Sequence, residues 1–222
     1  MKRLDVFTPG IVDYEEALDI QHELVEKRIS GEIADTLILL EHNPVITFGR
    51  GGKEDNLIAA ADTLKEKNVE IYKIERGGDV TFHGPGQLVG YPIIDLDNRG
   101  RDMHKFLREL EEVLINVIKS FDLDARRSEG YTGVWVDESK LAAIGVAVRR
   151  WVSFHGFALN IHNELSCFNL INPCGITDKA VGSISSMTKR LIDMGNVIDK
   201  VVVEFKNVFG YNEVNVFNNI RG

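Results

Sequence analysis

"RGGDVTFHGPGQ" (residues 76–87) contains four glycines and one proline among its twelve residues. Glycine adopts backbone conformations that other residues avoid, and it leaves neighbouring backbone N–H groups open to a ligand. The stretch therefore predicts a sharply turning connection whose N–H groups can bind an anion or a developing oxyanion. Arg76 and His83 add a positive charge and a proton carrier to it. The alternative is a hairpin or bulge that needs glycine only for its geometry.

Strand-like segments surround this connection on both sides. "VEIYKIE" (69–75) precedes it and "LVGYPIIDL" (88–96) follows it, and both are rich in residues that favour strands. Because several strands follow one another between helices, the predicted fold class is mixed α/β, or α+β, with a largely antiparallel sheet flanked by helices. The same composition predicts further strands at 36–42, 44–49, 133–137, 140–148 and 154–161.

Apolar residues at helical spacing predict helices at 13–30, 56–67, 102–121 and 196–208. For the first helix, Asp13 and Glu16 have the spacing of a capping box, and Gly31 is placed to end the helix. No internal repeat or linker-like stretch interrupts this pattern. The 222 residues suit one domain, so a single domain spanning 1–222 is expected.

The composition is that of an ordinary globular protein, with 44% apolar and 27% charged residues. The formal net charge of −8 argues against nucleic acid as a partner, because binding it usually needs a basic surface. Two basic pairs, Arg126 with Arg127 and Arg149 with Arg150, are interpreted first as solvated surface.

Neither a secretion signal nor a membrane segment is expected. The N-terminal residues 1–10 are basic but do not lead into the apolar core of a signal peptide. The most apolar run, 37–40, has the length of a strand and not of a membrane span. We therefore expect a cytoplasmic protein in which Cys167 and Cys174 are reduced and not joined in a disulfide.

Cys174 lies in the turn-like stretch "INPCGITDK" (171–179), between a proline and a glycine. Cys167 lies among apolar residues in "LSCFNLI" (165–171), which suits an inert buried thiol. A thiol with its ordinary pKa of about 8.5 needs a nearby cation or base to act as a nucleophile. Lys140 opens an apolar strand, and a desolvated lysine can stabilise a thiolate or accept a proton. A structural cysteine and a lysine that only extends to solvent remain open alternatives.

Metal and phosphate sites have weaker support. The six histidines show no H-x-x-x-H spacing, and the two cysteines no C-x-x-C spacing. His162, Cys167 and Cys174 could be grouped, but a fourth zinc ligand is not evident. "GRGGK" (49–53) departs from the spacing of a phosphate-binding loop and is interpreted as a turn that lines a pocket. We therefore predict no metal and no cofactor.

Four segments between residues 76 and 176 combine into a specific pattern. They are RGGDVTFHGPGQLVGYPIIDL (76–96), GVWV (133–136), SKLAAIGVAVRRWVSFHGFALN (139–160) and LINPCGI (170–176). In this order they resemble the lipoyl(octanoyl) transferase family of lipoate biosynthesis, with weaker agreement in "HNPVITFGR" (42–50). Together they are far more specific than any short motif alone.

This resemblance implies a fold like that of the catalytic domain of biotin and lipoate protein ligases. It implies an acyltransferase that moves an octanoyl group from octanoyl-acyl carrier protein to a lysine of lipoyl domains, in 2-oxoacid dehydrogenases and the glycine cleavage H protein. By motif, Cys174 corresponds to the nucleophile that carries the acyl group as a thioester, and Lys140 to its partner. The implied acyl-binding residues are Arg76, Gly77, Gly78, Asp79, Val80, Thr81, Phe82, His83, Ala143, Ile144, Gly145, Gly156, Phe157 and Ala158.

The residue types suit this chemistry. A cysteine thiolate exchanges one thioester for another of similar energy. A lysine of lowered pKa can then take a proton from the incoming amine, whose ordinary pKa is about 10.4. Small residues at Ala143, Gly145, Gly156 and Ala158 leave room for an acyl chain, although tight sheet packing also explains them.

The acidic charge of the chain bears on its partners. Acyl carrier proteins are generally acidic, so docking one on a chain of charge −8 needs a local basic patch. Arg149 with Arg150, and Arg126 with Arg127, are the candidates. A monomer is the expected state.

Two other classes of protein remain as alternatives. An ATP-dependent lipoate or biotin protein ligase of the same fold would activate a free acid as an adenylate, and such chemistry does not require Cys174. A non-catalytic acyl-binding module would leave both Cys174 and Lys140 dispensable. Thioester hydrolysis is a side activity at most, because no Ser-His-Asp arrangement is evident.

Overall fold

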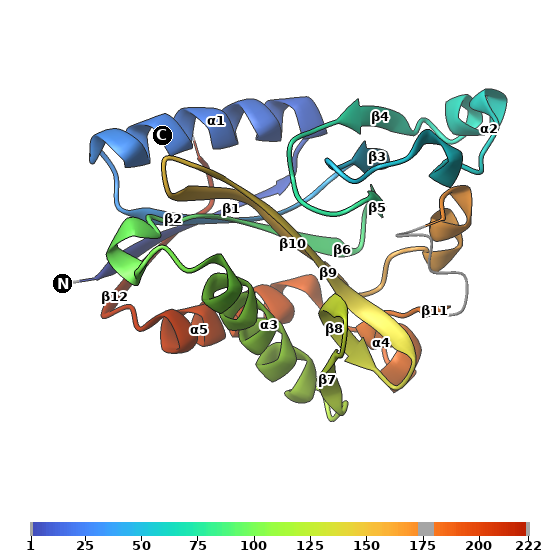
Figure 1. Ribbon diagram of the computed structural model, residues 1–222. Coiled ribbons are helices and arrows are strands. Elements are labelled where there is room, and N and C mark those ends of the chain that lie inside the picture. Colours follow the sequence, from blue (N-terminus) through green and yellow to red (C-terminus); the bar gives the residue numbers. More distant parts are fainter. Residues whose placement is uncertain (1, 173–179, 221–222) are drawn as a thin grey trace.

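The computed structural model describes residues 2–172 and 180–220. Within these residues the main sheet has nine strands, eight of them in the order β12-β1-β2-β6-β10-β9-β8-β7, with β11 beside β9 (Figure 1). Neighbours are antiparallel, except that β1 is parallel to β12 and β2, and β11 to β9. This mixed sheet confirms the predicted fold class. Its strands are β1 (Arg3–Ile11), β2 (Asp35–Glu41), β6 (Gln87–Ile93), β7 (Ala125–Ser128), β8 (Tyr131–Val136), β9 (Ser139–Arg149), β10 (Val152–Asn160), β11 (Ala180–Val181) and β12 (Glu213–Phe217).

Helices cover both faces of the main sheet (Figure 1). α1 (Tyr14–Ser30) packs on one face, in a core cluster with β2, β6 and β10. α3 (Met103–Lys119) and α5 (Met194–Phe209) lie against the other face and form the larger core cluster with it. Within the described ranges, none of the helices is long and apolar enough to span a membrane. The shorter elements are α2 (Ala61–Glu66), α4 (Ile184–Thr188) and the 3-10 helices η1 (Glu54–Asn56), η2 (Asp97–Arg99) and η3 (Leu165–Leu170).

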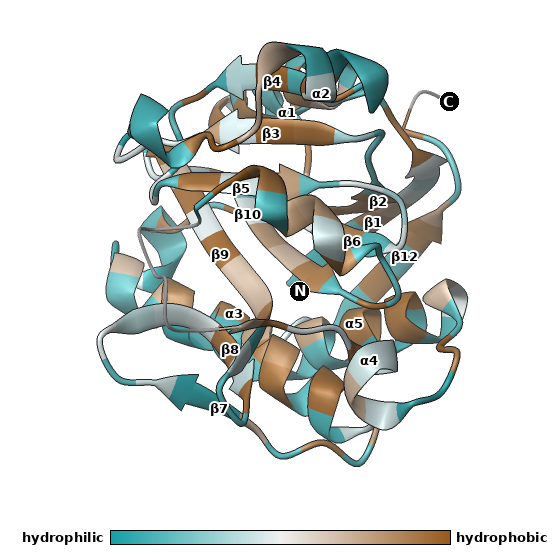
Figure 2. Cartoon of the chain, turned by 90° about the vertical axis from the view of Figure 1, so that its right-hand side faces the viewer, coloured by the Kyte–Doolittle hydropathy of each residue, from teal (hydrophilic) through white to brown (hydrophobic). Residues whose placement is uncertain are grey.

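A second, three-stranded sheet has the order β4 (Glu70–Lys73), β3 (Val45–Phe48), β5 (Val80–His83). It lies on the same side of the main sheet as α1, away from α3 and α5 (Figure 2). Strand β5 comes from the glycine-rich stretch, which was expected to be a connection. Residues 80–83 form a strand because they pair antiparallel with β3, with Val45 opposite His83.

The boundaries predicted for the first two helices are confirmed only in part. Gly31 ends α1 as expected, with a φ of +79°. The predicted capping box is wrong, because the Asp13 side chain accepts a hydrogen bond from Asn43 Nδ2 at 2.6 Å and caps no helical N–H group. The helix predicted at 56–67 begins only at Ala61. The preceding Ile58 and Ala59 N–H groups instead both donate to the Leu170 carbonyl oxygen at 3.0 Å, which holds the chain out of a helix.

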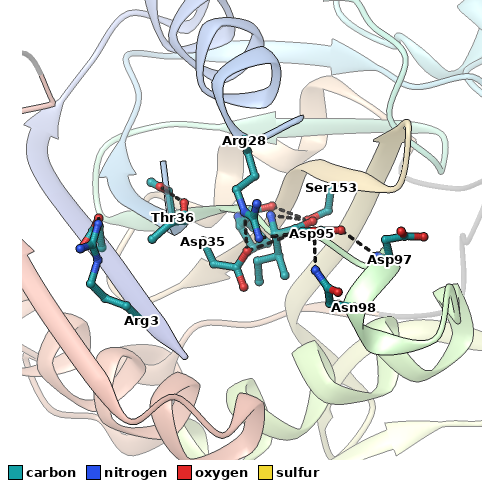
Figure 3. Close-up of polar contacts among 12 residues, drawn as sticks. Arg3, Arg28, Asp35, Thr36, Asp95, Asp97, Asn98 and Ser153 are labelled. Carbon is teal, nitrogen blue, oxygen red and sulfur yellow. Dashed lines mark hydrogen bonds and ion pairs between the residues drawn. The ribbon is translucent and has the colours of Figure 1, made fainter. Parts of the chain in front are cut away.

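The buried carboxylate of Asp35 joins the two helical layers through the sheet, and Figure 3 shows its contact with Arg28 on the α1 side. Asp35, at the start of β2, accepts hydrogen bonds from Arg28 Nε at 2.9 Å and from the Asp95 N–H group at 3.1 Å. Its other oxygen accepts from the Tyr211 hydroxyl at 2.8 Å. Arg28 belongs to α1, whereas Tyr211 follows α5. Asp35 therefore links elements on opposite faces of the main sheet.

Candidate active site

Three neighbouring strands form the floor of a cavity on the α1 side of the main sheet. In β10, Ala158 pairs with Val89 of β6 and with Ala143 of β9. Two positions away, Gly156 pairs with Gly145. Alternate residues of a strand face the same side, so these small residues share one surface.

Residues 76–83 form the roof of the cavity. The Gly77 N–H group donates to the Val146 carbonyl oxygen at 2.9 Å, which attaches the roof to β9. A Cβ atom on Gly145 would lie only 2.7 Å from the Gly77 carbonyl oxygen. Close packing of roof on floor therefore explains the glycine at 145 by itself, whereas the alanines at 143 and 158 face the open space.

Arg76 holds the roof against the second sheet. Its Nη2 atom donates to the Thr47 carbonyl oxygen at 2.6 Å, and its Nη1 atom donates to the Gly77 carbonyl oxygen at 3.0 Å. The "GRGGK" turn lies behind the roof, where the Gly51 N–H group donates to the Gly78 carbonyl oxygen at 3.0 Å. The turn therefore supports the cavity wall and does not line it.

Roof and floor enclose an open cavity with about 850 Å³ of space between atoms, part of it continuous with solvent. Its lining is mostly apolar with a few polar groups, as is usual in small-molecule sites. Lys140 lies on its wall. So do twelve of the fourteen residues predicted to bind the acyl group: Arg76, Gly78, Asp79, Val80, Thr81, His83, Ala143, Ile144, Gly145, Gly156, Phe157 and Ala158.

The other two predicted residues, Gly77 and Phe82, lie beside the cavity and do not line it. Gly77 makes the backbone contact that attaches the roof to β9. Phe82 belongs to the core cluster beneath the second sheet, with its ring centroid 5.8 Å from that of Phe168.

Several lining residues were not predicted from the sequence. Alternation along β6 is the signal that could have found some of them, because Gln87, Val89 and Tyr91 face the same side. No comparable signal marked Tyr14, at the start of α1. The additional lining residues are Tyr14, Gln87, Val89, Tyr91, Leu141, His155, Asn160, Phe168 and Val181.

Lys140 is half-buried near the start of β9, at the cavity wall. Its Nζ atom lies 5.5 Å from the centre of the Trp135 ring, within the range of a cation–π contact. Its backbone pairs with Val181 of β11. Gly133 leaves space for its stem, since a Cβ atom there would lie 2.7 Å from Lys140 Cε. The lysine therefore has a defined position at one end of the cavity.

Cys174, the predicted nucleophile, lies outside the described residues. On either side of 173–179, the Asn172 N–H group donates to the Asn56 carbonyl oxygen at 2.7 Å, and Val181 lines the cavity beside Lys140. Cys167 is partly buried in η3, where burial raises the pKa of its thiol. The described ranges contain no group of three or more His, Cys, Asp or Glu residues placed to hold a metal ion.

His83 lies in a buried chain of hydrogen bonds at the cavity. Its Nδ1 atom lies 2.7 Å from Gln87 Oε1. The Gln87 amide nitrogen donates to Asn160 Oδ1 at 2.9 Å and to the Phe82 carbonyl oxygen at 3.2 Å, so its oxygen is the acceptor that faces His83. His83 Nδ1 therefore carries the proton. Burial and the nearby His42 lower the pKa of His83 to about 3, so the ring is neutral at neutral pH.

A second buried pair fixes Tyr91. Its hydroxyl lies 2.6 Å from His42 Nε2, and His42 Nδ1 lies 2.7 Å from the Val12 carbonyl oxygen. A carbonyl only accepts, so His42 donates from Nδ1 and accepts the Tyr91 hydroxyl proton at Nε2. Burial raises the pKa of Tyr91 well above its ordinary value and lowers that of His42 to about 4. Both groups are therefore neutral supports of the cavity wall.

One of the two basic pairs contains Arg127, which is held in ion pairs, and the other, Arg149 with Arg150, lies far from Lys140. Arg127 contacts the carboxylates of Glu111 and Glu112 at 2.9 and 2.7 Å. Arg149 contacts Glu26 at 2.9 Å, at the turn end of the β9–β10 hairpin. Lys140 is near the opposite end of β9, and at about 3.3 Å per residue the two positions are roughly 30 Å apart.

Comparison with known proteins identifies the family. Residues 13–206 match the family model of the lipoyl protein ligase A/B catalytic domain. An octanoyltransferase from Geobacter metallireducens is 50% identical over 196 residues, which are 88% of this chain and 89% of that protein.

Solved structures agree on the fold. Lipoate-protein ligase A bound with ATP has a TM-score of 0.77 at 15% identity, over 97% of this chain and 88% of that one. A bi-partite lipoate protein ligase from Thermoplasma acidophilum, studied with its E2 lipoyl domain, has a TM-score of 0.70 at 15% identity, over 98% and 86%.

The fold is that of a lipoate protein ligase catalytic domain. The chain belongs to the lipoyl protein ligase A/B catalytic-domain family, and it is an acyltransferase.

Proposed function

We propose that this enzyme transfers an octanoyl group from octanoyl-acyl carrier protein to Cys174, and from Cys174 to a lysine of lipoyl domains. The observation that supports this most is the apolar cavity floored by small residues, with Lys140 at one end. The octanoyltransferase relatives support the acyl group, and the Thermoplasma ligase with its E2 lipoyl domain supports the acceptor. Residues 1–222 would act as one catalytic domain in the cytoplasm.

In the first half-reaction, the Cys174 thiolate attacks the carbonyl carbon of the donor thioester. The carrier thiolate leaves, so one C–S bond forms and one breaks. Lys140, as the ammonium, lowers the pKa of Cys174 and protonates the departing thiolate. It is then a neutral amine.

In the second half-reaction, the acceptor lysine must lose protons to become an amide. Its ordinary pKa is about 10.4, so it arrives mostly as ammonium. Neutral Lys140 removes one proton, the free amine attacks the Cys174 thioester, and Cys174 leaves as the thiolate. The second proton of the amine goes to solvent, so Lys140 is again the ammonium and Cys174 the thiolate, and the cycle closes.

The described residues leave few N–H groups in the HGPG loop for the oxyanion. Pro85 has no N–H group, the Gly86 N–H group donates to Glu41 Oε2 at 2.6 Å, and the Gln87 N–H group donates to the Gly84 carbonyl oxygen at 3.2 Å. We therefore assign the oxyanion hole to backbone N–H groups at Cys174 and Gly175.

The test is intact-mass spectrometry of the protein mixed with octanoyl-acyl carrier protein, without ATP. We expect a mass increase of one octanoyl group, lost when a lipoyl domain is added. The adduct should be absent from Cys174→Ser and present in the matched control Cys167→Ser. If acylation of the lipoyl domain needs octanoate and ATP, and no adduct forms from the thioester, the protein is an ATP-dependent ligase instead. Octanoate binding with no transfer under either condition would indicate an acyl-binding module.

A further inference from the structure

We infer that His155 closes the far end of the cavity and limits the length of the acyl chain, an inference that rests on the proposed function. The cavity runs along β9 and β10, with Lys140 at one end and His155 toward the other. The thioester is proposed to react at Lys140. The methyl end of the acyl group would therefore point toward His155.

His155 interrupts the regular alternation of β10. Its φ is +52°, in the left-handed region, whereas strand residues have negative φ values. Its ring centroid lies 4.8 Å from that of Phe154, the preceding residue. Neighbouring side chains of a regular strand point to opposite faces, so the unusual φ turns both rings to the same side. That side carries α1, because the Phe154 ring also contacts His22 of α1, with 5.8 Å between the ring centroids.

The surrounding structure holds His155 in this conformation. Pro92 lies opposite it in the continued register of β6 and β10, and proline has no N–H group to donate. The His155 N–H group donates to Gln21 Oε1 of α1 at 2.8 Å. A Cβ atom on Gly156 would lie 2.1 Å from the Gly90 carbonyl oxygen, so the adjacent strands meet here only because residue 156 is glycine.

The space beyond His155 is filled. Ile93, Phe154 and Ala147 follow the floor residues on the same face, and all three are buried in the core cluster under α1. The cavity lining includes His155 but none of these three residues. His155 is therefore the last side chain of β10 that an acyl chain would meet.

Three energetically unfavourable features coincide at this residue. The backbone has a positive φ, the residue is only 1% exposed, and neither ring nitrogen has a hydrogen-bond partner within the described part of the chain. Nε2 lies 3.8 Å from Glu75 Oε2, beyond hydrogen-bonding distance. Burial lowers the pKa of His155 to about 4, so the ring is neutral. Such features concentrate at ligand sites, where binding and not stability maintains them.

The test compares His155→Gly and His155→Asn with the parent chain by calorimetric titration with octanoate and with decanoate. Both replacements tolerate a positive φ, so the strand keeps its path. The ratio of the decanoate to the octanoate dissociation constant should fall by roughly 10-fold in His155→Gly. Each methylene group moved into an apolar pocket strengthens binding about fourfold. His155→Asn should give a smaller change in the same direction.

His22→Ala is the matched control, because His22 contacts both Phe154 and Glu75 but does not line the cavity. It should leave the ratio unchanged. An unchanged ratio in the His155 variants, with thermal unfolding showing that they are folded, overturns the inference. If only one of the two His155 variants folds, the ratio of dissociation constants measured for that variant decides the test.

The experiments distinguish a failure of the proposed function from a failure of the inference about His155. If the parent chain prefers octanoate to decanoate but takes no acyl group from a thioester, the inference about His155 stands and the proposed transfer is wrong. If octanoyl and decanoyl donors acylate the parent chain equally, and the ratio of the two dissociation constants is the same in His155→Gly, the proposed transfer stands and the inference about His155 is wrong.

Discussion

The two faces of the main sheet are covered in different ways. On one face, α3 and α5 pack large side chains such as Phe106, Leu110 and Phe205 against the strands. On the other face, α1 covers only part of the sheet, and the glycine-rich segment 76–83 covers the rest and leaves a cavity. A helix fills the space beneath it with side chains, whereas a segment rich in glycine cannot. Stability therefore depends mainly on one face and chemistry on the other.

The largest expected effect belongs to the cavity face. Lys140→Gln should lower the rate of lipoyl-domain acylation by about 100- to 10,000-fold, because it removes the proposed acid–base group. The free energy of unfolding should change little. Lys200→Gln is the matched control, since Lys200 Nζ also lies over an aromatic ring, 5.2 Å from the centre of Phe121, but on the helix face. Equal losses in the two variants would remove the distinction between the faces.

Acid sensitivity should also come from the cavity face. Burial lowers the pKa of His42 and His155 to about 4, and burial together with His42 lowers that of His83 to about 3. The unfolded chain binds protons at these groups near pH 6.5, so it binds more protons than the folded chain between pH 6.5 and 4. The free energy of unfolding should therefore fall as the pH falls through this window, by about 4 kcal/mol per pH unit near pH 5 for three histidines.

Urea unfolding at pH 8, 7, 6 and 5 measures this dependence. These histidines should have no influence above pH 7.5, where they are neutral in both states. A free energy of unfolding that is flat between pH 7 and pH 5 would contradict the buried, neutral state of the three rings.

Two consecutive residues of β9 give the sharpest comparison of the faces. Ala142 is 1% exposed in the core cluster under α3 and α5, whereas Ala143 lines the cavity. Ala142→Leu should lower the free energy of unfolding by about 1–3 kcal/mol through overpacking, with little change in the rate of acylation per folded molecule. Ala143→Leu should cost less than about 1 kcal/mol but lower the rate of octanoylation more than 10-fold, because it fills the groove. Urea unfolding and intact-mass kinetics measure both, and similar behaviour of the two variants would mean that the faces are not distinct.

The smallest effect is expected at the turn of the β9–β10 hairpin. Charge reversal of Arg149 and Arg150 should change the apparent KM for octanoyl-acyl carrier protein by less than about twofold. The turn lies roughly 30 Å along β9 from Lys140, the proposed site of reaction, and Arg149 is already paired with Glu26 at 2.9 Å. Steady-state kinetics with the carrier-bound donor and with octanoyl-CoA test this. A selective rise in KM for the carrier-bound donor would place the docking patch at this turn.

Most of the secondary structure could be predicted, because the α3 and α5 stripes and the strands from β8 to β10 have strong local patterns. Other elements could not be predicted in this way. β1 and β12 have weak patterns of their own and form at the sheet edge by parallel pairing with each other across the length of the chain. The helix predicted at 56–67 is shortened because the Leu170 carbonyl oxygen, far away in sequence, takes two of its N–H groups.

The candidate site divides in the same way. Motifs locate Arg76, His83, Lys140 and the small residues of β9 and β10, and Cys174 remains a prediction from motif. Alternation along β6 could have found Tyr91, but the place of Tyr14 in the cavity wall was known only from the structure, because the wall combines elements that are distant in sequence.

The sequence by itself determined the class of fold, the family motifs and the glycine-rich segment that cannot fill the space beneath it. These properties depend on local sequence patterns, which are present in the chain before it folds. The tertiary structure alone decided that His155 turns into the cavity. Its conformation depends on Pro92 across the sheet, on Gln21 of α1 and on the space left by Gly156. No local pattern encodes contacts between segments that meet only in the folded chain, so this end of the cavity was visible only there.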